Sequence, residues 1–226
     1  MLKSILEDRN RLALTAQLAL CHTVPVLLHQ VFMTGIVKLG LFKQYSIQPP
    51  AKTPFDQKPA LFAKVWFDTA LNHLVKIPLA ILLALPLLSK RITGMSARDS
   101  LTLPPLKTLG LHLLASIVIE DALFYWSHRI LHDKWLFKHV HRKHHEFHNL
   151  AAYPIASEYT HPVESIVGNV VPTLAGPMLV GCNFATLQLW LVIRMLKTSD
   201  AHCGYDFPFS PFGLCWPLNE ALSIAW

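Results

Sequence analysis

Long runs of apolar residues without a formal charge dominate this sequence and limit the folds open to it. The stretch 12–37 contains no Lys, Arg, Asp or Glu, and the stretch 165–193 is uncharged over 29 residues. Two further apolar stretches lie at about 65–88 and 106–126. A helix that crosses a membrane needs about 20 such residues. The expected fold is therefore all-α and built from helical hairpins integral to a membrane, because helices satisfy their own backbone in lipid.

The composition and charge agree with a membrane setting. Charged residues make up 15% of the chain, whereas an ordinary soluble domain carries about 25%. The formal net charge is +6, but the basic residues are spread between the apolar runs and form no continuous stripe. We therefore expect them to flank membrane segments rather than to bind nucleic acid. The four cysteines suggest no disulfide framework.

The apolar stretch 165–193 allows two topologies. Pro172, Pro177 and Gly181 interrupt it, which favours two short half-helices that enter the membrane and return. A returning hairpin would put His202 on the same side as the histidines between 128 and 148, whereas a single span would put it on the opposite side. Basic residues accompany those histidines, so this side is expected to be cytosolic.

Seven of the 13 histidines lie between residues 128 and 148. His128 and His132 are spaced i, i+4, and His141, His144 and His145 are spaced i, i+3, i+4, so each group shares one face of a helix. Imidazole suits iron, zinc, copper and nickel. Five imidazoles exceed the needs of one tetrahedral zinc. We therefore predict that these five residues are the metal ligands of a catalytic two-metal site.

Other features narrow the function further. Four histidines lie singly near apolar runs and are expected to be ordinary interior residues; they are His22, His29, His73 and His112. His145-Glu-Phe-His148 is one residue short of the zinc-protease motif. The sequence contains no dinucleotide fingerprint, phosphate loop or hydrolase elbow. Nicotinamide or flavin is therefore not expected to bind this chain through those motifs.

At its histidine groups the chain resembles the fatty acid hydroxylase superfamily, and within it the sterol 4-methyl oxidase branch. The two histidine boxes are specific as a pair, and several flanking sequence motifs occur in the same order as in the family. The matching stretches are Tyr45–Pro49, Glu120–His132, His141–Phe147, Glu158–Glu164 and His202–Pro208.

The resemblance implies a helical protein of the endoplasmic reticulum membrane with a cytosolic di-iron site. It implies oxygenation of a lipid or sterol C–H bond, with electrons from NAD(P)H through a partner reductase and a b-type cytochrome. It adds His161 and His202 to the metal ligands. Glu120 and Asp121 are the expected partners that orient an imidazole. Residues 1–105 would form an N-terminal membrane region and 106–226 the histidine-box domain.

The chain departs from the family pattern in one respect. The family has a third box, of the form His-x-x-His-His, downstream of the Gly-Tyr-Asp-Phe-Pro word, but no histidine follows His202 here. The resemblance therefore predicts a form shortened at the C-terminus that lacks up to three ligands. Two alternatives to the oxygenase stay open: a non-catalytic shortened member of the same family, and a membrane zinc protein.

Overall fold

The fold is helical throughout the residues that the computed structural model describes, 2–47, 58–147 and 153–212. The predicted all-α class is therefore confirmed. The α-helices are α1 (Leu2–Leu39), α3 (Pro59–Leu71), α4 (Ile77–Leu88), α5 (Leu106–Leu131), α6 (Lys134–His139), α7 (Pro162–Glu164), α8 (Val171–Val180) and α9 (Phe184–Ala201). The 3-10 segments are η1 (Lys43–Tyr45), η3 (His141–Phe147) and η4 (Pro154–Glu158). The π-helical segments are η2 (Asn72–Lys76) and η5 (Ser165–Val170).

Within the described residues, four helical stretches are long and apolar enough to cross a membrane. They are Asp8–Leu39, Pro59–Leu88, Leu106–Leu131 and Pro162–Val180. Large apolar side chains point outward from them; Val31, Leu74 and Leu83, for example, are 70%, 77% and 71% exposed. Water would penalise so much exposed apolar surface, whereas lipid tails would not. The chain is a membrane protein, as predicted.

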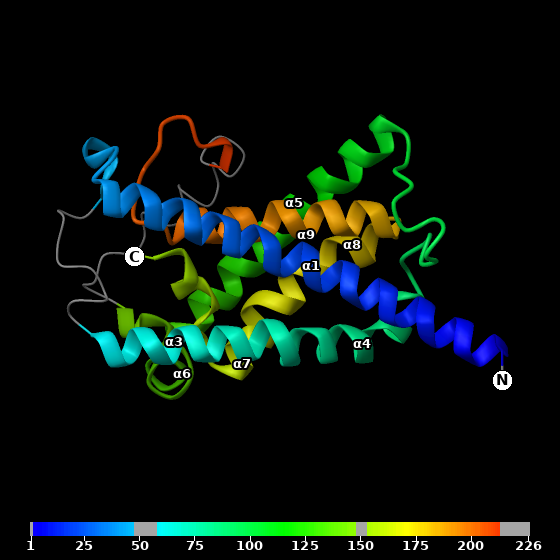
Figure 1. The fold of residues 1–226 in the computed structure, drawn as a ribbon, viewed down its shortest axis with the longest axis horizontal. Helices are drawn as coiled ribbons and strands as arrows, with labels where there is room; N and C mark the ends of the chain where they lie inside the picture. The colour runs from blue at the N-terminus through cyan, green and yellow to red at the C-terminus, as the bar shows by residue number, and fades with distance from the viewer. Residues whose placement is uncertain (1, 48–57, 148–152, 213–226) are drawn as a thin grey trace.

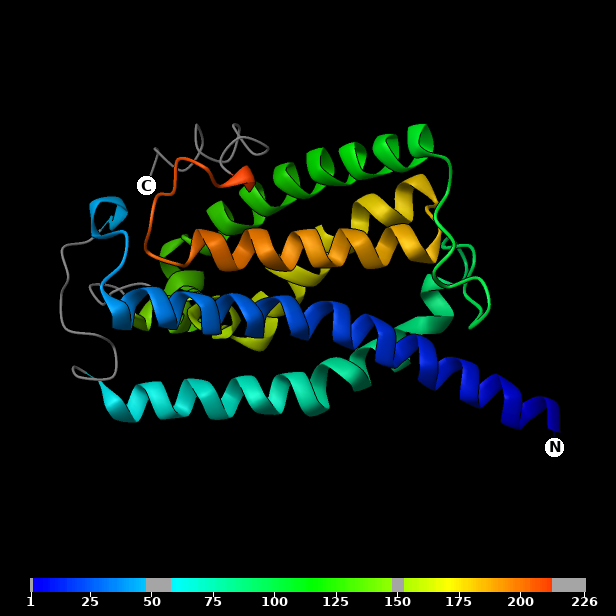
Figure 2. The ribbon, with the colours of Figure 1, turned by 45° about the horizontal axis from the view of Figure 1, so that its top comes forward.

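Helices α8 and α9 form the returning hairpin that the sequence favoured (Figures 1 and 2). Gly181 ends α8 in the left-handed region at φ 63°, which costs glycine little. The Asn183 side chain then accepts the Thr186 N–H over 3.0 Å and caps α9. The predicted half-helices were too short, however, because α9 continues through Arg194 and beyond.

Buried ion pairing explains why α9 extends past the uncharged stretch. Arg194 is 3% exposed, and its Nε lies 2.6 Å from Oε1 of Glu120 on α5. The Arg194 guanidinium also lies over the Phe124 ring, 5.4 Å from its centroid. A charge this deeply buried is tolerated only when it is paired. Arg194 can therefore lie inside the helical bundle. A prediction based on charge alone ends the apolar segment just before this residue.

Two contacts fix the helices around α8 and α9. The indole Nε1 of Trp190 donates a hydrogen bond of 2.8 Å to the Thr173 carbonyl. A Cβ built at Gly176 would lie 2.5 Å from Cα of Ser116 on α5, so α5 and α8 approach closely at this glycine. Small residues allow such backbone approach between membrane helices.

The short segments α6 and η3, which follow α5, lie at the end of the bundle opposite the N-terminus (Figures 1 and 2). The C-terminal ends of α1 and α9 lie at this same end. The histidines of α5, η3 and α9 are thereby brought to one region, although up to 74 residues separate them in the chain, from 128 to 202.

Candidate metal centre

The first histidine box lies where α5 ends. His128 occupies the last turn, and the amide of His132 bonds to the His128 carbonyl over 3.2 Å as the helix stops. The Asp133 side chain then accepts the Trp135 N–H over 2.9 Å and starts the short helix α6. Because α6 is only six residues long, the chain comes back with His141 beside the first box.

Four imidazoles converge at this point. The Nε2–Nε2 distances are 3.2 Å from His128 to His132, 3.2 Å from His132 to His141, and 3.0 Å from His141 to His145. Their donor atoms all lie within 4.8 Å of one another. Metal–nitrogen bonds of about 2.0–2.1 Å place neighbouring ligand nitrogens roughly 3.0–3.4 Å apart. These residues, here called the four-imidazole set, could therefore hold a metal ion.

A carboxylate on α7 orients the most buried member of the set. Nδ1 of His141 donates to Oε1 of Glu164 over 2.8 Å, and His141 is 0% exposed. With the proton on Nδ1, Nε2 presents its lone pair to the other imidazoles, an arrangement typical of metal-binding histidines. The carboxylates predicted for this role lie elsewhere: Glu120 pairs with Arg194, and Asp121 lies in the field of Lys197 and Arg194.

His144 lies at the edge of the four-imidazole set, with its ring centroid 5.6 Å from that of His141 and 5.5 Å from that of His145, and it faces His202. The two Nε2 atoms are 3.3 Å apart, and Nδ1 of His202 donates to the Thr198 carbonyl over 2.8 Å. His202 therefore also turns an Nε2 lone pair inward. The five imidazoles named from the sequence lie near one another, with His144 between the four-imidazole set and His202. The buried Nδ1 of His144 has no hydrogen-bond partner in the described part of the chain.

Burial keeps several of these imidazoles neutral. It lowers the pKa of His132 from its ordinary 6.5, and the nearby His141 lowers it further. Burial, followed by the charge of His202, holds the pKa of His144 well below 6.5. The pKa of His202 is lowered mainly by burial. Neutral imidazole is the form that binds metals.

His161 lies apart from both groups. Its Nδ1 accepts the Val163 N–H over 3.2 Å and caps α7. This contact uses the ring nitrogen locally, at the start of the helix that supplies Glu164.

A further histidine group was missed from the sequence. His22 on α1, His73 in η2 and Glu158 in η4 have donor atoms that lie within 4.8 Å of one another. Burial acts to raise the pKa of Glu158, but its hydrogen bond with His73 and the charges of its neighbours outweigh burial and lower that pKa. No local signal pointed to this group, because its members lie far apart in the chain and each stands alone in its own segment.

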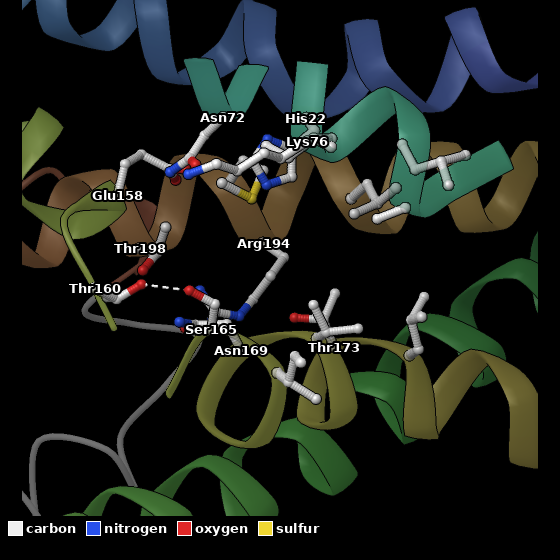
Figure 3. A pocket seen from close by; sticks show the side chains of 18 of the residues that line it. His22, Asn72, Lys76, Glu158, Thr160, Ser165, Asn169, Thr173, Arg194 and Thr198 are labelled. Atoms are coloured by element: carbon white, nitrogen blue, oxygen red, sulfur yellow. Dashed lines mark hydrogen bonds between the residues drawn. The ribbon is translucent and has the colours of Figure 1, made fainter. Parts of the chain in front are cut away.

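A cavity of about 430 Å³ lies between α1, α4, η4, η5, α8 and α9 (Figure 3). Glu158, Thr160 and Thr198 lie at one end of it in Figure 3. Apolar side chains line much of the rest; they include Leu18, Ile81, Leu174, Leu187 and Leu191. A second cavity, of about 20 Å³, is bounded by His128, His144 and His202. Four residues line both cavities: Ser157, Thr160, Asn169 and Thr198.

Comparison with known proteins identifies relatives over most of the chain. The fatty acid hydroxylase family model matches residues 113–222. Very-long-chain aldehyde decarbonylase GL1-11 of Oryza sativa subsp. indica is 38% identical over 199 residues, which are 85% of this chain and 70% of that protein. Methylsterol monooxygenase 2-2 of Arabidopsis thaliana is 38% identical over 191 residues, 81% of this chain and 67% of that protein. No solved structure matches the chain.

The family match and the relatives agree with the arrangement of the two histidine boxes. The matched residues 113–222 contain the four-imidazole set, His144 and His202. The relatives extend the similarity well beyond that domain, into the N-terminal half. The chain belongs to the fatty acid hydroxylase superfamily.

Proposed function

We propose that this protein is an iron-dependent membrane oxygenase that hydroxylates a C–H bond of a sterol or another lipid. The observation that carries the proposal is the pair of cavities. The larger one is of a size that holds small-molecule ligands, and it shares four lining residues with the cavity bounded by His128, His144 and His202. A lipid in the larger cavity would have one end at the histidines.

The polarity of the larger cavity favours an amphipathic substrate. Its end near the histidines carries hydroxyl and amide groups from Thr160, Asn169 and Thr198. Most of the remaining lining is apolar, and Asn72, Lys76 and Arg194 add polar groups to it. A hydroxyl or carbonyl oxygen would lie at the polar end and a hydrocarbon body in the apolar part. The oxidised carbon would then be close to the polar group of the substrate. The cavity walls would also exclude water from the reacting end.

The histidines divide into two proposed ligand groups. The four-imidazole set would hold one iron, with His141 positioned by Glu164. His144 and His202 would contribute to a second iron, but two imidazoles alone complete no ordinary coordination shell. We leave His161 out of both groups, since its donor atoms belong to no group of possible metal ligands among the described residues. Bound iron would supply the activation of dioxygen that the side chains lack.

Electrons are proposed to come from NAD(P)H through a partner reductase and a b-type cytochrome. Lys134, Lys138 and Arg142 are exposed beside the histidine boxes. Such a basic surface would attract an acidic electron-transfer protein. The proposed location is the endoplasmic reticulum membrane, with the histidine end in the cytosol, as expected for a face rich in Lys and Arg.

Product analysis would test the oxygenase function. The purified protein in lipid nanodiscs, with a reductase and a b-type cytochrome, would be given a 4-methylsterol or a long-chain aldehyde under isotopically labelled dioxygen. We expect labelled, hydroxylated product that is absent with His141→Ala. Iron-loaded protein that turns over neither substrate would contradict the proposal and favour the non-catalytic alternative.

Metal content would distinguish the iron oxygenase from the alternative of a membrane zinc protein. Four imidazoles also complete a tetrahedral zinc site, so zinc is the competing occupant of the four-imidazole set. Elemental analysis of the purified protein, beside a His144→Ala His145→Ala control, would distinguish the two metals. Iron that the control lacks supports the oxygenase. About one zinc per chain without iron supports a zinc protein.

A further inference from the structure

A third group of possible metal ligands lies in the wall of the large cavity, formed by His22, His73 and Glu158. They come from α1, η2 and η4, and their donor atoms lie within 4.8 Å of one another. His22 and Glu158 line the cavity, and Figure 3 shows both side chains there. His73 is 6% exposed and lies in a π-helical segment, a local irregularity that is frequent at functional sites.

Hydrogen bonding prepares His73 as a ligand. Its Nδ1 lies 2.8 Å from the Thr23 hydroxyl, and its Nε2 lies 3.5 Å from Oε2 of Glu158. A metal-bound histidine commonly engages its other ring nitrogen in this way. The buried Nδ1 of His22 has no hydrogen-bond partner in the described chain. A buried polar atom without a partner is costly, and a bound cation beside it would supply one.

The charges around Glu158 also favour a bound cation. The Arg194 guanidinium, whose charge acts on Glu158, forms its ion pair with Glu120 at 2.6 Å. Among the described residues, no lysine or arginine forms an ion pair with Glu158. A proton on His73 could balance the carboxylate, but it would leave no role for His22, whose ring centroid is 5.2 Å from that of His73. A divalent cation uses both imidazoles and the carboxylate at once.

We propose that His22, His73 and Glu158 bind a single divalent first-row metal ion, separate from the four-imidazole set. Two histidines and one carboxylate are the ligand set of mononuclear non-haem iron sites and of many catalytic zinc sites, which keep positions open. Two of the three ligands line the cavity, so the open positions face it. A hydroxyl or carbonyl oxygen of a lipid is the ligand they would take, and this last step alone rests on the proposed function.

Cobalt titration would test the site with the metal alone. The full-length protein in detergent would be stripped with a chelator, reloaded with Co²⁺ and followed by visible absorption and elemental analysis. We expect the wild type to bind about one equivalent more than His73→Gln or Glu158→Gln. A His132→Gln variant should lose metal from the four-imidazole set and keep this additional equivalent. Zn²⁺ competition should displace the cobalt.

Matched variants make the result decisive. His112→Gln changes another half-buried histidine of a membrane-spanning helix that belongs to no ligand group, and it should bind as much cobalt as the wild type. His73→Gln and Glu158→Gln keep the hydrogen-bonding shape, and their melting temperatures would be measured alongside. Equal cobalt binding by these two folded variants and the wild type would overturn the proposal. Loss of cobalt only in His132→Gln would leave the four-imidazole set as the metal site and reject this one.

Discussion

At the scale of single residues, Glu164 is the side chain whose effect on the metal centre is most specific. Its Oε1 accepts a hydrogen bond from Nδ1 of His141, and the two atoms are 2.8 Å apart. Glu164→Gln should weaken metal binding by roughly 10–100-fold, because the amide no longer stabilises the oriented imidazole electrostatically. Competition with a chelator of known affinity would measure the change. Glu146→Gln, at an exposed carboxylate of η3, is the control, and equal losses in both variants would remove the special role of Glu164.

The lowered histidine pKa values predict how the stability of the metal-free protein depends on pH. His132, His144 and His202 have folded-state pKa values below the ordinary 6.5. As the pH falls through about 6.5, the unfolded chain takes up protons that the folded chain does not, so stability decreases. The chelated protein should therefore melt at a lower temperature at about pH 5.5 than at about pH 7.5. His144→Gln should reduce this difference in melting temperature. An unchanged difference would contradict the lowered pKa of His144 as one of its causes.

Residue by residue, the sequence predicted the histidine boxes through local spacing, because residues three or four apart meet on a helix face. It did not predict that Nε2 of His144 lies next to His202, nor that Glu164 rather than Glu120 hydrogen-bonds an imidazole. Both depend on how α7 and α9 pack against the boxes, which spacing does not encode. The group of His22, His73 and Glu158 was not predicted for the same reason, because its three distant segments meet only in the folded chain.

At the scale of helices, the contact between α5 and α8 depends on Gly176. A methyl group there would lie 2.5 Å from Cα of Ser116, a backbone atom that cannot move without shifting the helix. Gly176→Ala should therefore destabilise the protein by about 1–3 kcal/mol, despite the higher helix propensity of alanine. Thermal unfolding in detergent would measure it. Gly110→Ala on α5, where no atom lies within 4 Å of the added carbon, should be neutral or slightly stabilising.

The lengths of the apolar runs and the positions of Pro and Gly predicted where the helices lie. Pro172, Pro177 and Gly181 predicted the α8–α9 hairpin. The sequence did not predict where α9 ends, because Arg194 and Lys197 resemble the charged boundary of a membrane segment. They are buried beside Glu120 and Asp121, so pairing between helices overrides the charge pattern. The division into a membrane region, 1–105, and a histidine-box domain, 106–226, stays a prediction.

At the scale of the whole molecule, the four residues that line both cavities, here called the neck, would lie between the substrate and the histidines in the proposed function. Asn169 is half-buried at this neck and belongs to η5. Asn169→Phe should block passage of the substrate end and lower kcat/KM by on the order of tenfold, equivalent to about 1.4 kcal/mol of transition-state stabilisation. Metal content should stay unchanged, because Asn169 belongs to neither group of histidines.

The matched control lies two residues away on the lipid-facing side. Val171 is 51% exposed and lines neither cavity, so Val171→Phe adds an aromatic ring without narrowing the neck. Steady-state turnover of both variants in nanodiscs, with metal analysis of the same samples, would separate access from metal loss. If Asn169→Phe keeps full turnover with normal metal content, the substrate reaches the histidines by another route, and the large cavity is not its binding site.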